Sequence, residues 1–143
     1  MLRFMIIDGP NLNLTGFREL DIYGLEKTED YLAKIRTAFP DIEINYYQSN
    51  IEGEIINKLH ECRLGYDGII LNAGGYTHTS VSVADAIRAI KTPVVEVHIS
   101  NIFSREEFRQ KSLLAPYCNG VITGFGMVSY KLAIISILEQ SKI

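Results

Sequence analysis

Apolar runs and amphipathic stretches alternate along this chain. The first apolar run, residues 2–7 (LRFMII), is followed by the turn residues Asp8-Gly9-Pro10-Asn11, which predicts a buried strand that ends in a loop. Over residues 28–39 the apolar positions recur at spacings of three and four, a pattern typical of an amphipathic helix that begins at or near Thr28. The chain therefore begins as strand, loop and helix.

The same alternation continues to the C-terminus. Further strands are predicted at residues 42–47, 67–71, 93–97 and 120–122, and further helices at residues 51–64, 79–90 and 130–138. The helix predicted over residues 51–64 places four residues on one face, Ile51, Ile55, Leu59 and Cys62, and is predicted to end at Gly65. Strands that alternate with helices imply right-handed crossovers and a parallel sheet covered on both faces. We predict a flavodoxin-like α/β three-layer sandwich with a five-stranded parallel sheet in the order 2-1-3-4-5.

Length and composition place this fold in one domain. The chain has 143 residues, so we expect a single catalytic domain over residues 1–143. Hydrophobic residues make up 47% and charged residues 22%, which is ordinary for a soluble protein. Because the sequence contains no apolar run near the roughly 20 residues of a membrane helix and starts directly with a strand pattern, we expect a cytoplasmic protein with no membrane partner.

Charge and cysteine content exclude several classes of site. A net charge of −3 with interspersed signs argues against a nucleic-acid partner, which would require clustered Lys and Arg. Cys62 and Cys118 form neither a CxxC pair nor a repeated metal spacing, and we expect two buried free thiols. The histidines and acidic residues are dispersed, so no metal site is predicted.

Three polar segments follow predicted strands: residues 8–13 (DGPNLN), 72–80 (NAGGYTHTS) and 98–101 (HISN). In doubly wound sheets ligands bind beyond the carboxyl ends of the strands, where the strand order reverses. We expect these segments to converge on one rim, which makes the rim the predicted ligand site.

Glu96 and His98 lie two residues apart in an otherwise apolar strand, so both side chains point to the same face. A carboxylate bonded to one imidazole nitrogen fixes the tautomer and leaves the other nitrogen to act as acid or base. The alternative is a purely structural pair at the end of the sheet.

Tyr23 and Arg18 lie in the polar loop after the first strand, above the same rim. An unperturbed tyrosine has a pKa of about 10, and an adjacent guanidinium is a means of stabilising the phenolate near neutral pH. Gly16 and Gly24 lie at the ends of this loop, which predicts a lid that closes over substrate. The alternative is an ordinary surface loop.

The remaining polar features have two interpretations each. His78 stands beside hydroxyl residues where an oxyanion can bind, or it belongs to a helix cap, and His60 is expected to face solvent without a role. Gly124-Phe125-Gly126 is similar to the start of a dinucleotide fingerprint, but Ser129 fills the third glycine position, so a turn before a helix is favoured. A phosphorylated receiver domain is excluded because Asn72 stands where its phosphoacceptor aspartate would be.

The sequence resembles the type II 3-dehydroquinate dehydratases along essentially its whole length. The motifs that carry the resemblance are DGPNLNL at residues 8–14, Arg18-Glu19 with Tyr23-Gly24, Asn72 with YTHTS at residues 76–80, EVHISN at residues 96–101, and REEFR at residues 105–109 followed by Ser112. Five motifs in this order are hard to match by chance.

The resemblance implies reversible dehydration of 3-dehydroquinate to 3-dehydroshikimate, a shikimate-pathway step, through an enolate and without a cofactor. It implies Tyr23 as the base, Arg18 as the group that lowers its pKa, and Asn11 as the stabiliser of the enolate through a water. His98 would be the acid, oriented by Glu96.

The resemblance also implies a set of substrate ligands, namely Asn72, His78, the backbone of Ile99 and Ser100, and Arg109. Asp85 matches a residue that reaches the site of a neighbouring subunit, and the family forms trimers assembled into a dodecamer. Two other hypotheses stay open from the residues alone: a non-catalytic flavodoxin-like module that binds a small carboxylate or nucleotide, and a flavin carrier.

Overall fold

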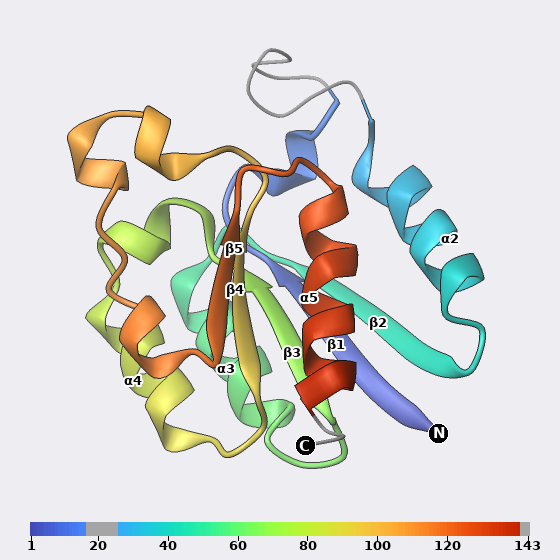
Figure 1. Cartoon of the computed structure of the whole chain (residues 1–143). Helices are drawn as coiled ribbons and strands as arrows, with labels where there is room; N and C mark the ends of the chain where they lie inside the picture. Colours follow the sequence, from blue (N-terminus) through green and yellow to red (C-terminus); the bar gives the residue numbers. More distant parts are fainter. Residues whose placement is uncertain (17–25, 141–143) are drawn as a thin grey trace.

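The computed structural model describes residues 1–16 and 26–140 (Figure 1). Five strands form one sheet: β1 (Leu2–Asp8), β2 (Ile42–Gln48), β3 (Gly68–Asn72), β4 (Val94–His98) and β5 (Gly120–Thr123). All neighbouring strands pair in parallel in the order β2-β1-β3-β4-β5. The predicted fold class and strand order are confirmed.

Helices cover both faces of this sheet (Figure 1). The described α-helices are α2 (Thr28–Ala38), α3 (Glu52–Glu61), α4 (Val81–Ala89) and α5 (Val128–Gln140). Short 3-10 turns lie in the segments that follow β1, β3 and β4: η1 (Leu12–Leu14), η2 (Gly74–His78), η3 (Ile102–Ser104), η4 (Glu107–Arg109) and η5 (Ala115–Tyr117). Within the described ranges, no helix has the length and apolar character needed to span a lipid bilayer.

The alternation of side chains along each strand divides the apolar core in two. Phe4 and Ile6 pack with residues of α2 and α5 on one face, whereas Met5 and Ile7 pack with residues of α3 and α4 on the other. This three-layer arrangement decides which face each strand-end side chain leaves from. Because a strand alternates its side chains, a shift of one position would move a residue to the other layer.

Local hydrogen bonds at the helix ends account for the differences from the predicted bounds. The prediction that Ile51 lies on the buried face of α3 is wrong: its backbone is extended, its N–H donates to Ser49 Oγ, and its side chain is 59% exposed. The helix also ends at Glu61, so Gly65, with a φ of 78°, belongs to the following turn. Ile55, Leu59 and Cys62 are buried as predicted.

The starts of α4 and α5 also differ from the predicted ones. Ser80 Oγ accepts from the Val83 N–H at 2.9 Å, so α4 starts at Val81 and not at Thr79. The turn that contains Gly124 and Gly126, with φ of 98° and 65°, directly precedes α5, as the sequence favoured.

Candidate active site

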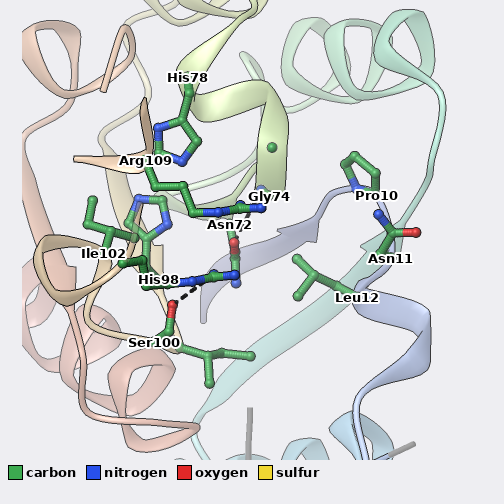
Figure 2. Close-up of a pocket in the computed structure, with 13 residues that line it drawn as sticks. Pro10, Asn11, Leu12, Asn72, Gly74, His78, His98, Ser100, Ile102 and Arg109 are labelled. Atoms are coloured by element: carbon green, nitrogen blue, oxygen red, sulfur yellow. Dashed lines mark hydrogen bonds between the residues drawn. The ribbon is translucent and has the colours of Figure 1, made fainter. Parts of the chain in front are cut away.

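A pocket opens at the carboxyl ends of β1, β3 and β4, on the rim where the sequence predicts a ligand site. Seven of the predicted site residues line it: Asn11, Asn72, His78, His98, Ile99, Ser100 and Arg109. Figure 2 shows Asn11 with Pro10 and Leu12 on one side, and His78 with His98 on the opposite side. The three polar segments do converge, which confirms the prediction from topology.

The wall between β1 and β3 is formed by two loops in backbone contact. The Gly9 N–H donates to the Asn72 carbonyl at 2.7 Å, and a Cβ on Gly9 would lie 2.5 Å from the Ala73 carbonyl oxygen. Only glycine allows this approach. Asn11 follows with a φ of 69°, and its N–H donates to Asn50 Oδ1 at 2.9 Å. This turn brings Asn11 to the pocket mouth.

His98 is held from behind by Glu96. His98 Nε2 lies 2.6 Å from Glu96 Oε2, and both side chains are buried, at 5% and 0% exposed. The predicted same-face arrangement is therefore confirmed. The bond engages Nε2 and leaves Nδ1 as the ring nitrogen available for proton transfer.

Ser112 completes the support of the histidine. Its hydroxyl donates to Glu96 Oε1 at 2.7 Å, while the N–H groups of Leu114 and Ala115 donate to Ser112 Oγ at 3.1 and 3.0 Å. The two N–H groups fill the acceptor side of the hydroxyl, which directs its proton to the carboxylate. Both oxygens of Glu96 are thus bonded, and its orientation is fixed.

His78 lies in η2 at the pocket edge. Its Nδ1 lies 2.7 Å from the Lys111 carbonyl oxygen, and its ring stacks on that of His98 with centroids 6.3 Å apart. Partial burial is the main cause that lowers the pKa of His78, so the ring is neutral at neutral pH and donates from Nδ1 to the carbonyl. The cap of α4 is formed by Ser80, so the helix-cap interpretation holds for this hydroxyl neighbour and not for the His78 ring.

Two arginines supply positive charge to the pocket. Arg109, the predicted ligand, forms an ion pair with Glu106, and Arg105 Nη1 donates to Ser100 Oγ at 3.2 Å (Figure 2). Guanidinium groups bind carboxylates through paired N–H donors, so this region suits an anionic ligand. Arg105 was not predicted as a site residue, although it lies four positions before Arg109 in the same motif.

Two of the predicted site residues that the structure describes do not line the pocket, namely Glu96, which lies behind His98, and Asp85. Arg18 and Tyr23 lie outside the described residues, as does the loop predicted to form the lid. Asp85 lies on α4 with its side chain 65% exposed and 3.9 Å from Arg88 Nη1. Asp85 is not among the described residues that line the pocket.

Both cysteines are free thiols. Burial raises the pKa of the Cys62 thiol to about 11 and that of Cys118 to about 12, so both remain protonated at neutral pH. Cys62 is buried as predicted, whereas Cys118 is only partly buried. Over residues 1–16 and 26–140, no group of three His, Cys, Asp or Glu side chains is arranged to hold a metal ion.

Comparison with known proteins identifies the family of this chain. The sequence profile described as "Dehydroquinase class II" matches residues 2–138. This chain belongs to the class II dehydroquinase family. The match covers nearly the whole chain and includes every residue that lines the pocket.

Individual dehydroquinases agree with this assignment. A 3-dehydroquinate dehydratase of Campylobacter jejuni strain 81-176 is 51% identical over 140 residues, which are 96% of this chain and 88% of the relative. A 3-dehydroquinate dehydratase of Nitratiruptor is 52% identical over 138 residues, which are 94% of this chain and 88% of the relative. The crystal structure of the type II dehydroquinase of Butyrivibrio crossotus superposes with a TM-score of 0.93 at 43% identity, covering 96% of this chain and 97% of that one.

Proposed function

We propose that this chain is a 3-dehydroquinate dehydratase, a hydro-lyase of the shikimate pathway that interconverts 3-dehydroquinate and 3-dehydroshikimate. The observation that carries the proposal is the family match over residues 2–138, together with relatives of this name at 51–52% identity. The buried His98–Glu96 pair at the edge of a pocket with two arginines supplies the acid and the anion-binding groups that such a reaction needs.

The first step removes a proton from the carbon next to the ketone. We assign this step to Tyr23 as phenolate, with Arg18 beside it in sequence to lower the pKa of the phenol and stabilise the transition state. Both residues lie outside the described residues, so the support for these roles is the motif that contains them. The electrons of the broken C–H bond form an enolate.

Negative charge on the enolate oxygen requires a donor. Asn11 is assigned this role through a bound water, because it lies at the pocket mouth on the side opposite His98 (Figure 2). In the second step the enolate re-forms the ketone, the C–O bond breaks, and His98 protonates the departing hydroxide to give water. Glu96 orients His98 and stabilises the ring when it is protonated.

Substrate recognition is assigned to the other polar groups of the pocket. We assign the substrate carboxylate to Arg109 and the backbone of Ile99 and Ser100, and the ring hydroxyl groups to Asn72 and His78, and the support is that all five residues line the pocket. The neutral state of His78 suits an uncharged hydroxyl partner. Both steps need only a base, an acid and a donor to the enolate oxygen, so we propose that the reaction proceeds without a metal, cofactor or lysine imine.

We further propose a cytoplasmic homo-oligomer built from trimers into a dodecamer, with neither nucleic-acid nor membrane partners. In this assembly Asp85 reaches the site of a neighbouring subunit. Its exposed position on α4 supports a contact between subunits over a role in its own pocket.

The test is turnover of 3-dehydroquinate. We expect absorbance from the conjugated enone of 3-dehydroshikimate to grow when substrate is added, and borohydride added with substrate to leave the activity intact because no imine forms. Folded protein that gives no absorbance change but binds a small carboxylate would instead support a non-catalytic binding module. A yellow preparation would support a flavin carrier.

A further inference from the structure

A buried hydrogen-bonded chain leads from the pocket into the core, and the mechanism above makes no use of it. Asn72 Nδ2 donates to the Tyr130 hydroxyl at 3.0 Å, and this hydroxyl donates to Asp8 Oδ1 at 2.7 Å. The three side chains come from β3, α5 and β1 and are 3%, 2% and 0% exposed. Of these three hydrogen-bonded side chains, Asn72 is the one that lines the pocket.

The direction of donation along this chain is fixed. Burial raises the pKa of Tyr130 well above its usual value, so this hydroxyl keeps its single proton. The pKa of Asp8 is raised by burial to about 6, which leaves an ionised carboxylate at neutral pH that can only accept. The Tyr130 proton therefore goes to Asp8, and its oxygen accepts from the amide NH2 of Asn72.

This direction selects one of the two orientations of the Asn72 amide. The two orientations exchange the N–H donors and the carbonyl acceptor, and the shape of the side chain does not distinguish them. With Nδ2 directed to Tyr130, Oδ1 accepts the Gly74 N–H at 3.3 Å. Asp8 and Asn72 are register partners on neighbouring strands, so both side chains leave the same face of the sheet beneath α5.

We propose that Asp8 and Tyr130 are positioning residues that fix the side-chain amide of Asn72 in the orientation that binds substrate. The proposal rests on the proposed function, because it takes Asn72 as a substrate ligand. Asp8, in the core, and Tyr130, in the first turn of α5, then contribute to substrate recognition through Asn72 and without contacting the substrate.

Tyr46 offers a matched control. Its hydroxyl donates to the other oxygen of the same carboxylate, Asp8 Oδ2, at 2.8 Å. It lies on β2 on the far side of Asp8 from Asn72 in the sheet order, and it is not among the described residues that line the pocket. Tyr46→Phe and Tyr130→Phe each remove one hydroxyl from Asp8, but only the second cuts the connection to Asn72.

The kinetic test compares these two variants with 3-dehydroquinate, after thermal melts have established that both fold. We expect kcat/KM to fall about tenfold in Tyr130→Phe, mainly through a higher KM, and by less than about twofold in Tyr46→Phe. In an Asn72→Ala background, Tyr130→Phe should cost less than about a further twofold, because its target is gone. Equal losses in the two phenylalanine variants, or a full tenfold loss in the Asn72→Ala background, would overturn the proposal.

A second measurement does not depend on activity. In protein labelled with ¹⁵N-asparagine, the side-chain NH2 resonances of Asn72 should shift in Tyr130→Phe and stay in place in Tyr46→Phe. Unchanged resonances in Tyr130→Phe would contradict the positioning role. A wild-type protein that does not convert 3-dehydroquinate would refute the proposed function and leave this spectroscopic test valid.

Discussion

The function of each side chain in this site depends on which of its atoms are already bonded. His98 has two ring nitrogens, and the bond from Nε2 to Glu96 leaves only Nδ1 for chemistry. Glu96 has two oxygens, and Ser112 and His98 take one each. The alternation of strand residues predicted the Glu96–His98 pair. Ser112 lies 16 residues from Glu96, and no local pattern could assign its hydroxyl to that carboxylate.

Replacement of His98 tests its proposed role as the general acid. We expect His98→Ala to lower kcat by about 10²–10⁴-fold, the usual contribution of a positioned general acid, while the fold persists. His60→Ala is the control, since His60 is an exposed residue of α3, and its turnover should match the wild type. Steady-state kinetics with 3-dehydroquinate checks both variants. Near-normal turnover in His98→Ala would remove His98 from the mechanism.

The buried carboxylate of Asp8 makes stability depend on pH. Its pKa rises from 3.8 to about 6 because burial removes water from the charged form, despite the donors from Tyr130 and Tyr46. Between these values the folded protein keeps a proton that the unfolded chain has released. This contribution to the free energy of unfolding therefore falls as pH rises from about 4 to about 6, by about 3 kcal/mol, and is flat above that range.

Urea unfolding of wild type and Asp8→Asn at pH 4, 5, 6 and 7 checks this expectation. The contributions of all other titrating groups are the same in both proteins and cancel in the difference between their free energies of unfolding. We expect the free energy of unfolding of Asp8→Asn, relative to that of the wild type, to rise between pH 4 and pH 6. Parallel profiles across the range would show that Asp8 has no raised pKa in the folded protein.

At the scale of elements, the ends of the strands determine the position of the site residues more than the bounds of the helices do. The start of α4 differs from the predicted one by two residues because the Ser80 side chain caps it, and helix bounds of this kind commonly vary by one or two residues. The loops after β1 and β3 have no such freedom, since Gly9 and Ala73 touch through their backbones. This contact positions Asn11 on one loop and Asn72 at the base of the other.

Gly9→Ala tests the loop contact. The added Cβ would lie 2.5 Å from a backbone oxygen, so we expect a loss of about 1–3 kcal/mol in the free energy of unfolding and a lower kcat/KM. Gly53→Ala is the matched control: no atom lies within 4 Å of its added Cβ, and alanine favours the helix by up to about 1 kcal/mol. Equal stability of the two variants in urea unfolding would refute the contact.

At the scale of the whole molecule, the site combines side chains from both faces of the sheet. Asn72 leaves the face covered by α2 and α5, while Glu96, paired with Leu71, leaves the face covered by α3 and α4, as does His98. Only at the strand ends, where the helices no longer separate the two faces, can these groups line one cavity. Asp85 lies on α4 with an exposed side chain, and its proposed role belongs to the site of a neighbouring subunit.

Mixing of variants tests that use. If Asp85 serves a neighbouring site, Asp85→Ala and His98→Ala should each have low activity. At the same total protein concentration, a co-refolded mixture should exceed the average activity of the two separate proteins. In a mixed trimer, a site with an intact His98 can receive Asp85 from the adjacent His98→Ala chain. Activity equal to the average of the separate proteins would show that Asp85 does not act across a subunit boundary.

The sequence by itself determined the strand order, the rim on which the pocket opens and the Glu96–His98 pair, because periodicity and topology depend on local spacing and general chirality rules. It also carried the motifs of the family. Only the tertiary structure decided that Arg105 and Ser112 belong to the site and that Tyr130, 122 residues from Asp8, connects Asp8 to Asn72. Such contacts depend on how α5 packs on the sheet, and no period along the chain records the distance between side chains of remote elements.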